Sequence, residues 1–285
     1  MNKTPFALAA GVLLSAVIPA LAQTEPPPPP KVLQIFREQV KPGKAAAHEK
    51  VEIGWPRAFA KANSPDHYVA LSSVTGPGEA WFITAYDSFA AFEKGQELVD
   101  KNPALKAETE ALSAQDGELL SGISSILAFH REDLSYRPAV HVPKMRFVQV
   151  TTVRVNQGRA NDYTAFRKLV NEAHDKAKMD EHWSVYEVVS GMPSPTYLIF
   201  QGMKSLADMD AFQEMHGKAY QDGLGEENRA RIRELQNKAV SNSTSQIFAM
   251  SPKMSYVSKE FAAVDSDFWS PKPAPLKIPA KQEKK

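Results

Sequence analysis

The sequence contains no cysteine among its 285 residues. Disulfide bonds, thiolate catalysis, zinc sites built on thiolates and cysteine-ligated iron–sulfur clusters are therefore excluded. An excess of charge of one sign is also missing, because 34 basic residues face 33 acidic ones. This balance gives no general attraction to nucleic acids or anionic membranes, so no nucleic-acid partner is expected. Apolar residues make up 43% of the chain and charged residues 24%, which is typical of a folded globular protein.

A long uncharged apolar run occurs at the N-terminus alone, over residues 6–22. It follows Lys3 and ends in Ala20-Leu21-Ala22, a pattern that precedes signal-peptide cleavage. We expect residues 1–22 to be a signal peptide, and the mature protein to be secreted or periplasmic, soluble and without a transmembrane segment. A retained anchor is the alternative, because the run has nearly the length needed to span a bilayer.

Two proline-rich segments flank the rest of the chain. Residues 23–30 contain five consecutive prolines and are predicted to form an extended linker. Residues 259–285 end in a stretch rich in proline and lysine and are predicted to form a C-terminal tail. The folded part of the protein is therefore expected between residues 31 and 258.

This central part contains an internal repeat. A shift of 115 residues aligns two pairs of segments, and the shift grows to 120 in a third pair, as loop insertions would produce. The pairs are Val40–Ala45 with Val155–Ala160, Asp66–Tyr68 with Glu181–Trp183, and Leu134–Tyr136 with Met254–Tyr256. The sequence thus predicts two units, 31–137 and 144–258, joined by a linker over 138–143.

Both units are predicted to follow the order βαββαβ. Alternating apolar residues predict strands at 32–40, 67–75, 79–86 and 122–130, and again at 145–155, 182–190, 196–201 and 245–250. Helices are predicted at 44–62, 88–114, 160–178 and 206–240. This order is that of a ferredoxin-like α+β fold. The strands are apolar on both faces but the helices can cover only one, so the two sheets are expected to face each other in a monomeric pseudo-dimer.

Two ferredoxin-like units of this kind resemble the dimeric α/β-barrel superfamily, here with both halves fused in one chain. The Val-x-x-Gly-(Lys/Arg)-Ala segments at Val40 and Val155, and hairpins with a glycine turn and aromatic strands, are similar to NIPSNAP-like and antibiotic-biosynthesis-monooxygenase-like members. The resemblance covers residues 31–258 and implies a pseudo-dimeric α/β barrel. Members of the superfamily include cofactor-free oxygenases, haem enzymes and proteins of no known activity, so the resemblance leaves the function open.

Four histidines are candidate acid–base residues: His67, His182, His48 and His174. The first two occupy equivalent positions at the start of the second predicted strand of each unit. The other two lie near the apolar stripes of the first helices and are not equivalent under the shift. In the first unit this stripe is predicted to consist of Ala47, Val51, Trp55 and Phe59. All four also fit structural roles, as residues at strand entries or at the boundary of the core. Divergence between the halves favours an enzyme, because one active half is sufficient.

Five aromatic residues are candidates for contact with a ligand, although each also fits a core position: Trp55, Tyr68, Trp81, Tyr163 and Trp183. No metal site is expected, because Glu52 stands where the motif H-E-x-x-H, begun by His48, requires a second histidine. No cofactor is predicted; if haem were bound, His174 or His216 would be its axial ligand.

Two functions follow from these features. The first is a secreted or periplasmic protein that binds a small apolar ligand, or an envelope partner, in a barrel pocket without catalysis. The alternative is a cofactor-independent oxygenase or isomerase that acts on an apolar or aromatic small molecule, with the candidate histidines as its acid–base groups. A purely structural component of the cell envelope is a third possibility.

Overall fold

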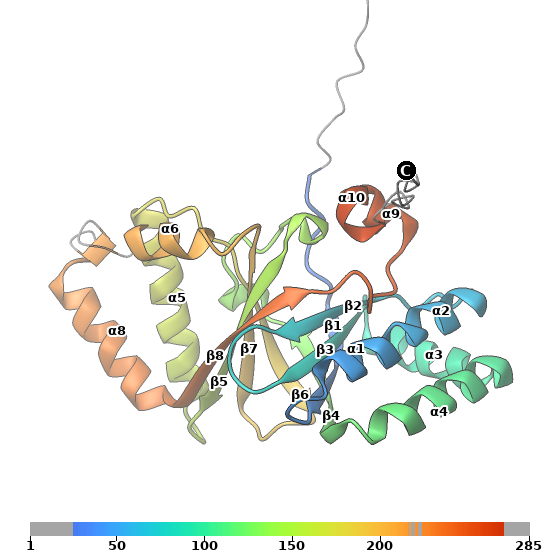
Figure 1. Cartoon of the computed structure of the whole chain (residues 1–285). Helices are drawn as coiled ribbons and strands as arrows, with labels where there is room; N and C mark the ends of the chain where they lie inside the picture. The colour runs from blue at the N-terminus through green and yellow to red at the C-terminus, as the bar shows by residue number, and fades with distance from the viewer. Residues whose placement is uncertain (1–24, 216, 218–219, 222–223, 271–285) are drawn as a thin grey trace, which may run out of the picture.

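The computed structural model describes residues 25–215, 217, 220–221 and 224–270 (Figure 1). The predicted signal peptide, His216 and residues 271–285 of the predicted tail lie outside the described residues. Within the described ranges, none of the helices combines the length and the apolar character needed to cross a bilayer.

The first half of the chain contains four strands and four helices. In order they are β1 (Val32–Val40), α1 (Ala45–Glu52), α2 (Gly54–Lys61), β2 (Tyr68–Ser73), β3 (Glu79–Tyr86), α3 (Phe89–Asp100), α4 (Pro103–Gly117) and β4 (Leu120–His130). The predicted helical region 88–114 is two helices, because Pro103 interrupts the chain and starts α4. The Ser88 hydroxyl accepts a hydrogen bond from the backbone of Ala91, and the Asn102 side chain caps α4 in the same way.

The second half repeats this order of strands and helices. Its elements are β5 (Phe147–Val155), α5 (Ala160–Lys176), β6 (Ser184–Ser190), β7 (Thr196–Met203), α6 (Asp208–Met215), α8 (Glu226–Ala239) and β8 (Val240–Met250). The prediction that the halves are two copies of one unit, forming a pseudo-dimer, stays a prediction. Short helices α9 (Lys259–Ala263) and α10 (Ser266–Trp269) follow, so the segment predicted as a tail begins with ordered structure.

The first predicted helix differs from its prediction in two ways. The single helix expected at 44–62 is broken at Ile53, because Pro56 has no backbone N–H to donate to the carbonyl of Glu52. The expected apolar stripe is also incomplete, since Ala47 is exposed. The buried residues of α1 are instead His48 and Glu52. This helix therefore presents polar side chains to the interior.

The eight strands form one closed antiparallel barrel in the order β1-β3-β2-β8-β5-β7-β6-β4. The sequence predicted two separate sheets, but the strands of both halves are joined in this one sheet through the pairs β2–β8 and β4–β6. Joining them removes edge strands whose backbone groups would otherwise lack partners. Gly191 permits close contact at one junction: it has φ +90°, and a Cβ atom would lie 1.9 Å from the carbonyl oxygen of Ser125.

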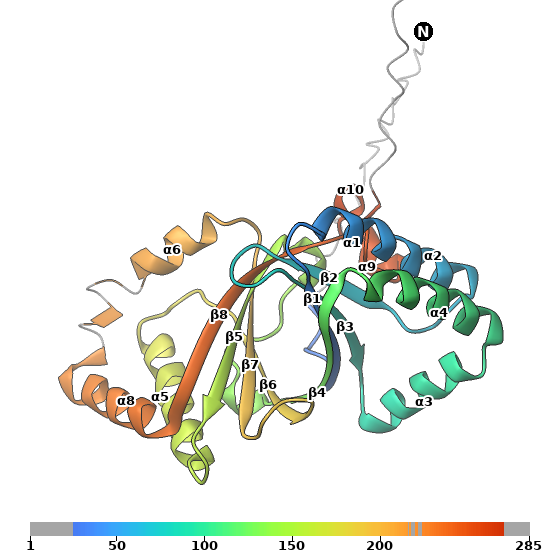
Figure 2. The ribbon, with the colours of Figure 1, turned by 60° about the horizontal axis from the view of Figure 1, so that its bottom comes forward.

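Side chains from all eight strands fill the barrel interior, among them Ile35, Trp81, Ile126, Leu198 and Phe248. The helices lie outside the barrel in two groups (Figures 1 and 2): α1 to α4 beside the first half, and α5, α6 and α8 beside the second. The outer face of the sheet in each half is therefore covered by that half's own helices. The space between sheet and helices is where the two halves differ.

Candidate functional site

A cavity of about 500 Å³ lies between the outer face of the first-half sheet and its helices. Aromatic side chains from both layers line it: Phe36, Phe82 and Tyr68 from the strands, and Trp55 and Phe59 from α2. Residues of α3 and α4 complete the wall. The cavity is thus mainly apolar and large enough for a small aromatic molecule.

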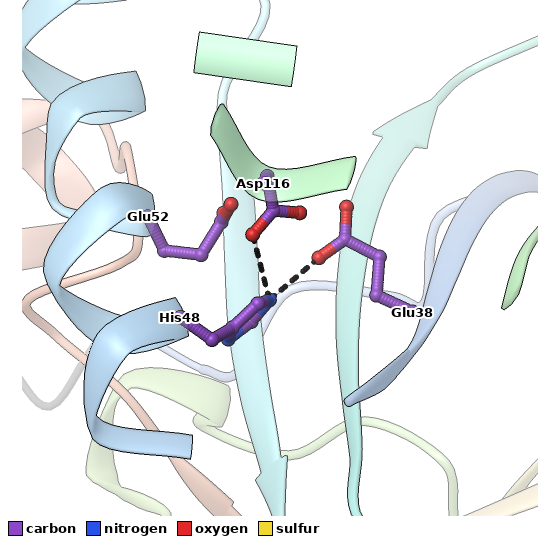
Figure 3. Close-up of side chains that lie close together, drawn as sticks. All are labelled: Glu38, His48, Glu52 and Asp116. Carbon is purple, nitrogen blue, oxygen red and sulfur yellow. Dashed lines mark hydrogen bonds and ion pairs between the residues drawn. The ribbon is translucent and has the colours of Figure 1, made fainter. Parts of the chain in front are cut away.

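Three carboxyl groups and one imidazole meet at this cavity (Figure 3). Glu38, Glu52 and Asp116 belong to its lining, and His48 lies beside them. The Nε2 atom of His48 is 2.8 Å from Oε2 of Glu38 and 3.7 Å from Oδ1 of Asp116. One donor atom from each of the four residues lies within 4.8 Å of the other three, so these residues are able to share a metal ion. We refer to them as the acidic cluster.

Local structure explains how each member reaches the cluster. Alternation along β1 places Glu38 on the same outer face as Gln34 and Phe36, which also line the cavity. His48 and Glu52 are four residues apart on α1 and therefore share one face of this helix. Asp116 lies in the last turn of α4, where the helix dipole disfavours a negative charge.

Burial and mutual repulsion change the protonation of the cluster. Burial, together with the charges of Glu38 and Asp116, raises the pKa of Glu52 to about 9. Burial and the Glu38 charge likewise raise the pKa of Asp116 to about 6, although His48 opposes this shift. At neutral pH, Glu52 therefore carries a proton. Among the described residues, no lysine or arginine forms an ion pair with the cluster.

Several polar atoms at this cavity lack hydrogen-bond partners within the described part of the chain. They are Oε1 of Glu52, Oδ1 of Asp116 and the hydroxyl of Tyr68, and all three are buried. The exposed fractions of Glu52 and Asp116 are only 2% and 3%. An unsatisfied buried polar group costs about 1–3 kcal/mol, so native structures contain few of them. Their concentration around one cavity points to a ligand that contacts them.

The structure places some of the predicted site residues at this cavity. His48 belongs to the cluster, and Trp55 and Tyr68 line the wall. His67 lies just before β2 and stacks on Tyr256, with 4.8 Å between ring centroids; it is not part of the cavity lining.

The other predicted histidines lie in the second half. His174 is 3% exposed, and its Nδ1 atom donates a hydrogen bond to the carbonyl of Val170. Its Nε2 atom is 3.4 Å from Glu181, and its ring packs against Trp183. His182 lies at the surface and donates to the backbone carbonyl of Arg137. The structure therefore does not bring these histidines to the acidic cluster.

The other three predicted aromatic residues, Trp81, Tyr163 and Trp183, are buried core residues. Trp81 packs against Phe248 inside the barrel, and Tyr163 stacks on Tyr197 with 4.5 Å between ring centroids. Tyr163 is the residue that the 115-residue shift aligns with His48. The same shift aligns Glu38 with Val153 and Glu52 with Arg167. The second half therefore lacks the acidic cluster at the equivalent positions.

Sequence reasoning missed three members of the cluster: Glu38, Glu52 and Asp116. One signal was present, since Glu52 follows His48 by four residues on a predicted helix. The motif H-E-x-x-H requires a second histidine at that position, so it does not detect a carboxylate there. Nothing in the local sequence connects these two residues with Asp116, which reaches them only through the packing of α4 on α1.

The sequence matches no protein-family model and no curated protein. Similar folds occur among solved structures. A provisional monooxygenase from Fusobacterium nucleatum shares 13% identity over 78% of this chain and 93% of its own, with a TM-score of 0.51. An anthrone oxidase-like protein shares 10% identity over 78% of this chain and 91% of its own, with a TM-score of 0.52. Together with the closed antiparallel barrel, this likeness confirms the predicted α+β class of the fold.

Proposed function

We propose that the protein is an enzyme that moves protons on a small aromatic molecule in the first-half cavity, as a cofactor-independent oxygenase or isomerase. One observation carries the proposal: a buried Glu52 carboxyl group, whose Oε1 atom has no hydrogen-bond partner among the described residues, lies beside the Glu38–His48 pair at an aromatic cavity. Proton transfer needs such a donor and acceptor within reach of one substrate.

The cluster offers distinct roles to its members. Glu38 accepts a proton from a carbon that a neighbouring carbonyl group acidifies, and His48 holds this carboxylate in place through the 2.8 Å contact. Glu52 donates a hydrogen bond to the substrate oxygen, where negative charge develops. Pairing a carboxylate base with a hydrogen-bond donor in apolar surroundings is an established way of stabilising an enolate.

Two fates of the resulting carbanion distinguish the two reactions. In an isomerase the proton returns to another carbon. In an oxygenase the electron pair of the carbanion attacks dioxygen and a C–O bond forms. The resulting peroxide anion takes up the proton that Glu38 removed, and the hydroperoxide then loses water to give a carbonyl group. Anthrone is a suitable probe because anthrone and one dioxygen contain the atoms of anthraquinone and one water. The anthrone oxidase-like protein of similar fold supports this choice.

The test measures proton transfer first, in the absence of oxygen, and oxidation of the substrate second. Anthrone is incubated in deuterated buffer under nitrogen, and exchange of its methylene protons is followed by NMR; air is then admitted and anthraquinone is followed by absorbance. We expect the protein to accelerate exchange, and Glu38→Gln or Glu52→Gln to remove most of the acceleration. Tyr163→Phe is the matched control in the other half. Exchange no faster than in buffer, or unchanged in Glu38→Gln, would contradict the proposal.

A second cavity supports another candidate function, which is the binding of a small apolar ligand without catalysis. It measures about 530 Å³ and is lined by residues of the barrel interior, such as Leu33 and Leu71, and by segments outside the barrel, such as Pro27–Pro30 and α9. The uncharged fluorescent probe N-phenyl-1-naphthylamine is expected to bind there. Val264→Trp, at the lining residue that directly follows α9, should weaken this binding, and equal binding by both proteins would argue against the site.

We further propose that the mature protein is secreted or periplasmic and monomeric, with its two halves forming a pseudo-dimer. The N-terminal run and the repeated element order support these statements. Sequencing the N-terminus of protein taken from the cell envelope is expected to show Gln23 as the first residue. A chain that starts at Met1 would favour the retained anchor instead.

A further inference from the structure

We propose that the acidic cluster binds one divalent transition-metal ion, of the Mn²⁺, Fe²⁺ or Zn²⁺ type, through Glu38, His48, Glu52 and Asp116. The inference uses the residues of the proposed function but does not depend on it, because metal binding is measured without a substrate. It begins from the geometry of four side chains that come from three different elements of the fold (Figure 3).

The spacing of the donor atoms suits a single ion. Metal–ligand bonds of about 2.0–2.2 Å place ligand atoms about 3 Å apart when adjacent and about 4.4 Å apart when opposite. In the cluster, Nε2 of His48 is 2.8 Å from Glu38 and 3.7 Å from Asp116, and all four donor atoms lie within 4.8 Å of one another. Small side-chain rotations are enough to bring them around one ion.

Burial and charge favour a cation at the same place. The cluster contains three carboxyl groups, and its only cationic group among the described residues is the imidazole of His48, when that ring is protonated. Oε1 of Glu52 and Oδ1 of Asp116 are buried without hydrogen-bond partners. Figure 3 shows the Glu52 carboxyl group pointing toward the carboxyl group of Asp116. A bound cation would satisfy these oxygen atoms and compensate the charge.

The donor set indicates the type of ion. Ca²⁺ and Mg²⁺ prefer sites made entirely of oxygen atoms, whereas an imidazole nitrogen favours transition metals. Three carboxylates and one imidazole therefore suit Mn²⁺, Fe²⁺ or Zn²⁺. The equivalent residues of the second half, Val153, Tyr163 and Arg167, offer no comparable set. We expect one ion per chain.

Metal binding has a consequence for the proposed reaction. An ion at the cluster occupies lone pairs of Glu38 and Glu52 that proton transfer requires. Metal-loaded protein is thus expected to lose the anthrone exchange activity, and a chelator should restore it. Only this consequence rests on the proposed function.

The experiment uses the mature chain after treatment with a chelator and exchange into metal-free buffer. Mn²⁺ is added stepwise, and the free ion is measured by electron paramagnetic resonance, because bound Mn²⁺ loses most of its solution signal. We expect one Mn²⁺ per chain, displaced by equimolar Zn²⁺ but not by equimolar Mg²⁺. Glu52→Gln and Asp116→Asn should each weaken the affinity by at least about tenfold, since each removes an ion ligand.

The matched control is Glu49→Gln. Glu49 lies on the same helix, but it pairs with Lys253 and does not belong to the cluster. This variant should bind Mn²⁺ as the unmodified chain does, and circular dichroism should show that all variants are folded. The inference is overturned if Mn²⁺ does not bind, if Glu52→Gln binds it equally well, or if Mg²⁺ displaces it as Zn²⁺ does. Metal binding without proton exchange would contradict the proposed function alone.

Discussion

Replacing Glu52 with glutamine is expected to change how the stability of the metal-free protein depends on pH. Folding raises the pKa of this carboxyl group from 4.5 to about 9, chiefly through burial. Between these two values, the folded chain keeps a proton that the unfolded chain has released. Unfolding therefore releases a proton, and the free energy of unfolding falls as the pH rises.

The size of this change in the free energy of unfolding follows from the release of one proton on unfolding. While the pH lies well between the two pKa values, the free energy of unfolding falls by about 1.4 kcal/mol per pH unit. Between pH 6.5 and 8.5 this amounts to about 2.5 kcal/mol, because the folded carboxyl group begins to ionise as the pH approaches its pKa. The lower limit keeps most of the titration of Asp116, whose pKa is about 6, outside the range. Glutamine has the shape of the protonated carboxyl group and does not titrate, so Glu52→Gln lacks this contribution.

The assay is urea denaturation at several pH values, followed by tryptophan fluorescence in the presence of a chelator. Groups other than Glu52 titrate in both proteins, so the difference between the two unfolding free energies isolates this residue. We expect the variant to gain about 2.5 kcal/mol relative to the unmodified chain between pH 6.5 and 8.5. Glu49→Gln, at a partly exposed position, should show no such gain. A difference that stays constant with pH would refute the argument that Glu52 is buried as a neutral acid.

Three further predictions concern the barrel, the C-terminal helices and the cavity. Gly191→Ala should lower the free energy of unfolding far more than Gly158→Ala, because a Cβ would lie 1.9 Å from Ser125 at the first position and meets nothing within 4 Å at the second. Urea denaturation should give about 1–2 kcal/mol for Gly158→Ala, from its positive φ alone. Trp269→Ala should cost about 3–5 kcal/mol in the same assay, because this buried side chain also donates a hydrogen bond to Pro143. Phe82→Trp should fill part of the cavity and slow anthrone exchange while leaving Mn²⁺ affinity unchanged; a parallel loss of both would show a general disturbance of the site.

Local sequence patterns were sufficient for most of the elements. Short runs of apolar, β-branched and aromatic residues identified the strands, because a strand buried on both faces carries apolar side chains on both. Ser88 and Pro103 marked the starts of α3 and α4, since capping and the missing N–H of proline act within a few residues. The repeated order, and with it the α+β class of the fold, followed from these elements and from the shift between the halves.

The acidic cluster could not be predicted in this way. The apolar stripe expected on the first helix assumed that apolar residues are buried, whereas His48 and Glu52 are the buried residues of α1. Burial of a carboxyl group is unfavourable by itself, so a hydrophobic pattern does not indicate it. The cluster depends on Glu38 and Asp116, which become neighbours of His48 only when β1, α1 and α4 pack together.

The sequence by itself thus determined which elements form, their order, and the classes of chemistry that a chain without cysteine excludes. These properties depend on short-range periodicity, capping and composition. Tertiary structure alone decided that the strands close into one barrel and that a cavity remains in the first half. It also decided that Tyr163 packs in the core of the second half, whereas His48, at the equivalent position of the first half, contacts two carboxyl groups. These properties depend on contacts between residues far apart in the chain, which are selected by the packing of the whole molecule.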